Sequence, residues 1–245
     1  MSDTTDHAHP EYLQHHFHSA AQQRAASKLG IWVFIAQELL FFSGLFMAYA
    51  AFRFFYPETF LAAHEHLSVP MGAINTVVLI TSSLTMALAV RCAQIGDQKW
   101  LKIHLALTIM FACCFLVVKY FEYSAKYHHC LLPGDFYGFP EKDDAGNIKV
   151  DGKGHRTFAE HCEIPRSGVL EAKSAGIFFG IYFVMTGMHG LHVLIGIGLL
   201  GWILWKSTKG KFHPKYYSPV EYVGLYWHLV DLTWFFLFPL LYLVK

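Results

Sequence analysis

Charge is what this sequence has little of. Only 15% of its 245 residues are Asp, Glu, Lys or Arg, whereas a soluble domain carries about 25%. The formal net charge is +1, so no basic surplus points to nucleic acid as a partner. Hydrophobic residues make up 54% of the chain, and the few charges are gathered into short segments. That segregation is typical of a chain surrounded largely by lipid.

A secretory signal is also absent. Residues 1–28 are polar and contain no apolar core, so we expect the first hydrophobic run to act as the insertion signal. This tail is rich in histidine, but lacks the spacing and the cysteine partners of a structural metal site. It is either a solvated cytoplasmic tail or a proton-collecting surface, because histidine titrates near neutral pH. The histidines concerned are His7, His9, His15, His16 and His18.

Five long apolar runs dominate the remainder. About 20 helical residues cross a hydrocarbon core of about 30 Å, and every run meets that length. The runs are continuous rather than alternating, which argues against barrel strands. We therefore predict an all-α integral membrane protein with five transmembrane helices, three within residues 29–125 and two within 174–245. The runs are 28–53, 66–91, 102–123, 173–206 and 221–245.

Lysine and arginine predict the orientation of these helices. They gather in the short loops of one side, whereas the opposite short loop, residues 53–70, holds only Arg53. By the positive-inside rule the N-terminus faces the cytoplasm and the C-terminus the exoplasm. The basic side contains Arg24, Lys28, Arg91, Lys99, Lys102, Lys206, Lys209, Lys211 and Lys215.

Residues 126–173 then form a long exoplasmic loop. Two of the five cysteines, Cys130 and Cys162, lie in it. Because an exoplasmic location permits oxidation, we predict a disulfide between them that closes the loop. Two free thiols are the alternative.

Glu38 is an acid inside the first apolar run. A charged side chain at the centre of a membrane helix costs about 2.5–3.5 kcal/mol, so Glu38 is a candidate functional residue that needs a partner. The candidate partners are His189 and His192, spaced i,i+3 on the fourth helix. A structural hydrogen bond and a proton-linked role both remain open.

The membrane histidines do not form a recognisable metal site. His189, His192 and His228 lie on two helices, and they are too few for structural zinc. We expect them to form hydrogen bonds between helices, and we expect no metal bound by this chain. Gly187 and Gly190 flank His189 and predict that another backbone approaches there.

Two further acids stand in the third and fifth runs. Glu122 is bracketed by Lys119 and Lys126 at i−3 and i+4, which predicts a local ion pair near the exoplasmic interface, with Lys119 able to snorkel outward. His228 and Asp231 share a face of the fifth helix. We expect them to form a clasp or an inter-subunit contact.

Four segments resemble subunit III of the cytochrome c oxidase (haem–copper terminal oxidase) family, and they occur in the same order along the chain as in that family. Residues 37–44 are similar to its S-E-x-L-F-F-x-G stretch, with Gln37 at the usual small residue. Residues 186–193 resemble T-G-x-H-G-x-H-V, and residues 226–234 resemble Y-W-H-F-V-D-x-x-W with Leu229 for Phe. Residues 121–123 resemble its x-E-Y. Many members have seven helices; this chain lacks the first two and resembles the shorter bacterial forms.

The resemblance implies a multi-pass subunit of a bacterial cytoplasmic membrane that carries no haem or copper. Its partners would be the haem- and copper-bearing subunit I, subunit II, small subunits and phospholipid, within a complex that reduces O2 to water and moves protons. A larger respiratory supercomplex is a further expected setting.

The resemblance also singles out individual residues. Glu38 matches the carbodiimide-reactive glutamate of the family, and the other characteristic polar positions are His189, His192, Glu122, His228 and Asp231. Arg53 and Lys206 are candidate contacts for lipid headgroups.

Other functions are alternatives to this one. Other subunits select the electron donor, so a quinol oxidase subunit or a nitric-oxide-reductase accessory subunit is the alternative within the family. A proton-coupled transporter using Glu38 is disfavoured because the sequence shows no inverted repeat and no paired broken helices. An autonomous haem enzyme is the third class.

Overall fold

The computed structural model describes residues 14, 17–129, 131, 133, 173–214 and 216–243, and for residues 173–175 it describes the backbone alone. In these ranges all regular structure is helical, apart from one isolated bridge between His213 and Tyr216. Five helices are long and apolar enough to cross a membrane, which confirms the predicted number. The proposed disulfide between Cys130 and Cys162 lies outside the described residues.

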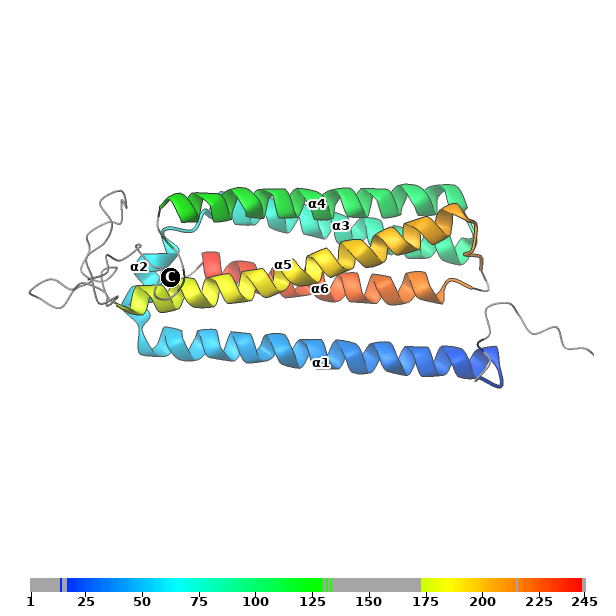
Figure 1. Ribbon diagram of the computed structural model, residues 1–245, viewed down its shortest axis with the longest axis horizontal. Coiled ribbons are helices and arrows are strands. Elements are labelled where there is room, and N and C mark those ends of the chain that lie inside the picture. Colours follow the sequence, from blue (N-terminus) through cyan, green and yellow to red (C-terminus); the bar gives the residue numbers. More distant parts are fainter. Residues whose placement is uncertain are drawn as a thin grey trace, which may run out of the picture.

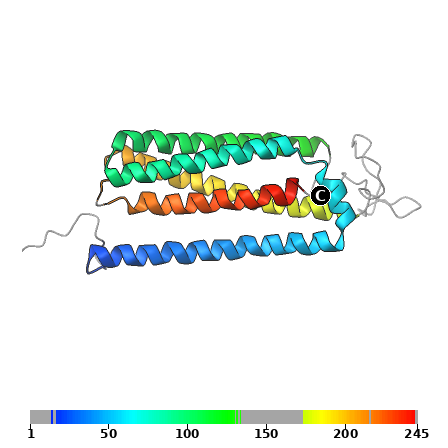
Figure 2. The ribbon, with the colours of Figure 1, turned by 180° about the vertical axis from the view of Figure 1, so that it is seen from behind.

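The five long helices lie side by side in one bundle (Figure 1). They are α1 (Ala20–Phe55), α3 (Val69–Ile95), α4 (Gln98–His128), α5 (Lys173–Thr208) and α6 (Ser218–Tyr242). Helices α3 to α6 pack together, whereas α1 runs along one edge in both views (Figures 1 and 2). Only 11% of the apolar span of α1 is buried, against 50% of that of α6. The core therefore belongs to α3–α6, and α1 is peripheral.

Local signals set the helix ends. The Ser19 hydroxyl accepts a hydrogen bond from the backbone N–H of Gln22 at 3.2 Å, so α1 begins inside the segment predicted as a polar tail. Gly96 ends α3 in the left-handed region, with φ of 84°. The Asp97 carboxylate then accepts from two N–H groups in the first turn of α4. This tight connection fixes α3 and α4 as an antiparallel pair.

Residues 53–70, predicted as a loop, contain a helix instead. Helix α2 (Pro57–His64) begins with proline at its first position and has Glu58 in its first turn, and both favour a helix N-terminus. Phe60 is fully buried and meets the Phe178 ring of α5 edge-on at 5.0 Å. The segment still connects two long helices, as predicted, but the sequence analysis did not predict that its apolar face would form a helix and pack at one end of the bundle (Figure 1).

A glycine marks the tight contact between α5 and α6, but not where the sequence predicted one. A Cβ on Gly196 of α5 would lie 2.6 Å from the Trp227 ring of α6. Gly187 and Gly190 have nothing within 4 Å of such a Cβ, so the predicted backbone approach beside His189 was wrong. Aromatic side chains, rather than a backbone, fill the space around that histidine.

Candidate functional site

Glu38 of α1 meets His192 of α5. Nε2 of His192 lies 3.0 Å from Oε2 of Glu38, and both side chains are largely buried. Nδ1 of His192 lies 2.7 Å from the Met188 carbonyl, which can only accept, so Nδ1 carries a hydrogen. A contact at Nε2 then needs one more proton, on either the carboxyl or the imidazole. The contact therefore joins α1 to α5 through one hydrogen bond between Glu38 and His192.

A cavity of about 330 Å³ adjoins this pair, lined by side chains of α1, α5 and α6. Tyr226 lines it and donates a hydrogen bond from its hydroxyl to the His192 carbonyl at 2.9 Å. The ring of Phe42 packs 5.2 Å from the His192 ring. The acid thus faces an apolar recess at the loosely packed side of the bundle.

His189 does not share this role. It is fully buried between the rings of Phe115 at 5.4 Å and Trp234 at 5.2 Å. Neither of its ring nitrogens has a hydrogen-bond partner among the described residues. The prediction of a satisfied interhelical hydrogen bond was wrong for His189. Three residues along a helix leave an offset of about 60°, which turns His192 toward α1 and His189 toward α4 and α6.

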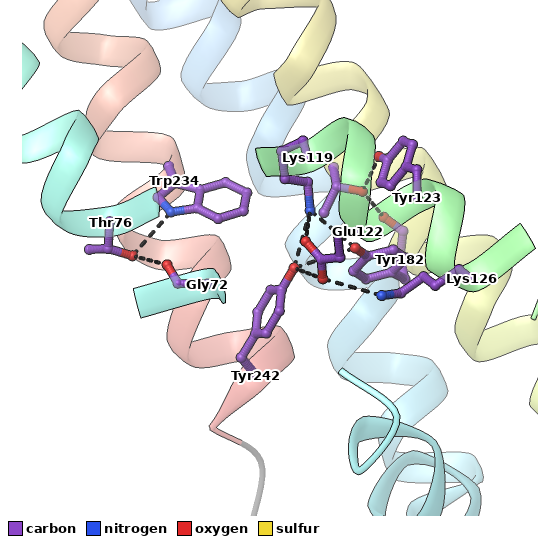
Figure 3. Close-up of polar contacts among 10 residues, drawn as sticks. Gly72, Thr76, Lys119, Glu122, Tyr123, Lys126, Tyr182, Trp234 and Tyr242 are labelled. Carbon is purple, nitrogen blue, oxygen red and sulfur yellow. Dashed lines mark hydrogen bonds and ion pairs between the residues drawn. The ribbon is translucent and has the colours of Figure 1, made fainter. Parts of the chain in front are cut away.

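Glu122 stands at the centre of a second cluster (Figure 3). Lys119 Nζ lies 2.8 Å from one carboxylate oxygen, and Lys126 Nζ lies 3.2 Å from the other. The Tyr242 hydroxyl donates to the same carboxylate at 2.6 Å. Lys119 also donates to the hydroxyls of Tyr182 at 3.0 Å and Tyr242 at 3.1 Å. The network therefore joins α4, α5 and α6.

This cluster is buried within the bundle, and the predicted local ion pair is present. The exposed fractions are 6% for Lys119, 2% for Glu122 and 3% for Lys126, so the prediction that Lys119 snorkels outward was wrong. Two cations share one carboxylate, and aromatic faces help to accommodate the second positive charge. Lys119 lies 5.2 Å from the centre of the Trp234 ring, and Lys126 lies 4.9 Å from that of Tyr182. Such an arrangement holds helices together.

His228 and Asp231 line a third feature, a groove between α3 and α6. Nδ1 of His228 lies 2.8 Å from the Ser83 hydroxyl of α3, which is the interhelical hydrogen bond predicted for this histidine. Asp231 is buried on the same side of α6. The groove has a volume of about 550 Å³ and is lined mainly by apolar side chains.

The two residues predicted to contact lipid headgroups lie far apart. Arg53 is in the last turn of α1, and Lys206 is in the last turn of α5. These helices run in opposite directions (Figure 1), so the two cations stand at opposite ends of the bundle and do not form one site. Lys206 Nζ lies 4.0 Å above the Trp202 ring. Their role toward lipid stays a prediction.

Sequence reasoning missed the hydroxyl partners. Tyr182, Tyr242 and Ser83 complete the clusters of Glu122 and His228. Tyr49 donates from α1 to the Leu240 carbonyl of α6 at 2.6 Å. A signal did exist, since a hydroxyl in an apolar membrane run needs a partner just as an acid does.

The described part of the chain holds no group of three or more His, Cys, Asp or Glu side chains placed to share a metal ion. The three buried acids Glu38, Glu122 and Asp231 lie in three separate places in the bundle. Proton holding, helix clasping and docking are the chemistry that this arrangement offers.

Comparison with known proteins gives a consistent result. The family model described as cytochrome c oxidase subunit III matches residues 8–130 and 168–245. A cytochrome c oxidase subunit 3 of Corynebacterium diphtheriae is 29% identical over 92% of this chain and 95% of its own length. One of Thermostichus vulcanus is 29% identical over 88% of this chain and 86% of its own length. A heme-copper oxidase subunit I+III of Aeropyrum pernix is 29% identical over 96% of this chain, which spans 24% of that longer protein.

Proposed function

Because the chain belongs to the cytochrome c oxidase subunit III family, we propose that it is a subunit, without a redox centre, of a proton-pumping haem–copper terminal oxidase that accepts electrons from cytochrome c. The observation that carries this proposal is the family match, which covers all five membrane helices. Haem and copper would belong to partner subunits, and bond chemistry would take place there.

The direct partner in this proposal is the catalytic subunit I. The relative in Aeropyrum pernix, named as subunit I+III, supports a close association, because domains of one chain are commonly neighbours. Subunit II, small subunits and a larger respiratory assembly are further partners. This chain would stabilise subunit I by packing against it in the cytoplasmic membrane of a bacterium.

Proton uptake and lipid binding are the supporting roles. The pair of Glu38 and His192 holds one proton beside an apolar recess, and this geometry supports a part in delivering protons to the catalytic subunit. The exposed apolar surfaces of the helices offer contact area for phospholipid acyl chains, and Arg53 and Lys206 are the proposed headgroup contacts.

Purification of the tagged chain from its native membrane in a mild detergent tests this function. We expect a haem–copper subunit to co-purify, together with oxidation of reduced cytochrome c by the preparation. The chain separated from its partners should be colourless. A chain that purifies without any haem–copper partner, or that retains a haem spectrum by itself, would contradict the proposal. Oxidation of quinol in place of cytochrome c would revise the electron donor.

A further inference from the structure

Asp231 is a buried acid whose hydrogen-bonding capacity the described residues do not fill. Both of its carboxylate oxygens are enclosed, and among the described residues the Ser83 hydroxyl is the group close enough to pair with one of them. Within hydrocarbon a poorly paired carboxylate is costly. Protonation would remove the charge, but one hydroxyl still cannot pair with both oxygens. In either protonation state Asp231 has room for a partner that the described part of the chain does not supply.

The polar neighbours of Asp231 are already engaged. The Ser83 hydroxyl is within reach of the carboxylate, but it also contacts Nδ1 of His228 at 2.8 Å, and its single hydrogen can be donated to only one of the two. The indole N–H of Trp234 donates to the Thr76 hydroxyl at 3.1 Å, and that hydroxyl donates to the Gly72 carbonyl at 2.9 Å (Figure 3). The groove thus presents an acid that the described neighbours pair incompletely.

The groove around Asp231 has the form of a docking site for a helix. Its walls are apolar side chains of α3 and α6 that project outward, among them Ile80, Leu84, Leu232 and Phe235. Its volume of about 550 Å³ provides room for side chains of a neighbouring helix. An acid at the base of an apolar groove favours a partner that brings a hydrogen-bond donor.

The depth of Asp231 distinguishes a protein helix from a lipid headgroup. Asp231 stands 13 residues after Ser218 and 11 before Tyr242, which places it about 20 Å and about 16 Å from the two ends of α6 at 1.5 Å per residue. Headgroups lie at the membrane surfaces, outside a hydrocarbon core about 30 Å thick. Acyl chains reach the middle but carry no hydrogen-bond donor. A side chain from another membrane helix can meet both requirements.

We propose that the groove between α3 and α6 is the face on which a transmembrane helix of the haem–copper catalytic subunit docks, and that this helix places a hydrogen-bond donor against Asp231. This inference rests on the proposed function, because it assumes that the catalytic subunit is present. It adds the face of contact and the chemistry of the contact.

Photo-crosslinking in the assembled complex tests the face. A photoreactive phenylalanine derivative at Leu84, which lines the groove and is 60% exposed, should crosslink to the catalytic subunit. The matched control position is Val117 of α4, which is 53% exposed and lies outside the groove. Crosslinking to lipid alone from position 84, or stronger crosslinking to the catalytic subunit from position 117, would overturn the inference.

Substitutions test the chemistry. Asp231→Leu should lower the fraction of chain that co-purifies with the catalytic subunit by about threefold to tenfold, as expected for loss of an interhelical hydrogen bond. Asp231→Asn should lower it less, because the amide retains an acceptor oxygen. Wild-type association of Asp231→Leu would contradict the inference.

A second pair of variants separates a loss of docking from a failure of the chain to fold. Leu84→Trp fills the groove without touching the core of this chain, and we expect it to reduce co-purification while the chain accumulates normally. Val117→Trp is the control and should leave co-purification unchanged. Failure of the unaltered chain to co-purify with any haem–copper subunit would defeat the proposed function itself. Intact co-purification of Leu84→Trp would defeat only this docking face.

Discussion

At the scale of single residues, the two buried glutamates Glu38 and Glu122 have different kinds of partner. Glu38 has a single imidazole across a helix interface, so its interaction depends on one shared proton. Glu122 has two ammonium groups and a phenol around it, so it is a counter-ion. The first arrangement can keep a hydrogen bond when the acid is replaced by its amide, whereas the second leaves two buried ammonium groups without a counter-ion if the charge of Glu122 is removed.

Glu38→Gln should leave the initial rate of O2 consumption by the assembled oxidase within about twofold of wild type, because a residue remote from the reacting atoms makes no transition-state interaction. The amide N–H can still donate to Nε2 of His192, so assembly should persist. Oxygen-electrode measurements in the first turnovers provide the test. Complete loss of turnover in a fully assembled complex would show that this acid is essential to the chemistry.

Glu122→Gln should destabilise the chain strongly. It leaves Lys119 and Lys126 buried without a counter-ion, and removing one member of a buried ion pair costs on the order of 3 kcal/mol or more. A thermal unfolding series in detergent would measure the loss. Glu58→Gln, at an exposed position on α2, is the control and should lose far less stability, because it weakens only the favourable charge in the first turn of that short helix. The double change Glu122→Gln with Lys119→Met should recover part of the loss, and equal midpoints for Glu122→Gln and Glu58→Gln would refute this account.

At the scale of elements, the apolar runs locate the helices well because a helix that crosses the hydrocarbon core must be apolar over its whole length. The runs do not locate helix ends, since these depend on caps such as Ser19 and Asp97. Helix α2 escaped prediction because eight residues are too few to show a membrane-length pattern. The apolar run also does not reveal which face of a helix is buried, because nearly all positions in it are apolar.

The contact between α5 and α6 provides a prediction at this scale. Gly196→Ala would place a methyl group 2.6 Å from a ring carbon of fully buried Trp227, and overpacking of this kind costs about 1–3 kcal/mol. Gly198→Ala, two residues along α5, meets nothing within 4 Å and should be neutral. Unfolding midpoints of the two purified variants give the comparison, and a neutral Gly196→Ala would mean that Trp227 can shift.

At the scale of the whole molecule, orientation in the membrane is the main property still to be measured. The basic side chains near the N-terminal end of α1 and in the turns after α3 and α5 predict that this end of the bundle faces the cytoplasm. Alkaline phosphatase needs disulfides that form outside the cytoplasm. A fusion after Lys245 should therefore be active, and a fusion after His213 should be inactive. The opposite pattern of activities would invert the topology.

The sequence by itself determined the membrane class and the number of candidate membrane-spanning helices, because the hydrocarbon core requires few charges and a continuous apolar length, and both are local properties of the sequence. Its ordered motifs determined the family. It also identified the acids and imidazoles that need partners. Only the tertiary structure decided which partner each one has. His192 faces Glu38 while His189 lies between two rings, and Asp231 lies in a groove where the described residues pair it incompletely. Those outcomes depend on the rotation of each helix about its axis, which packing against neighbouring helices sets and an almost uniformly apolar sequence does not encode.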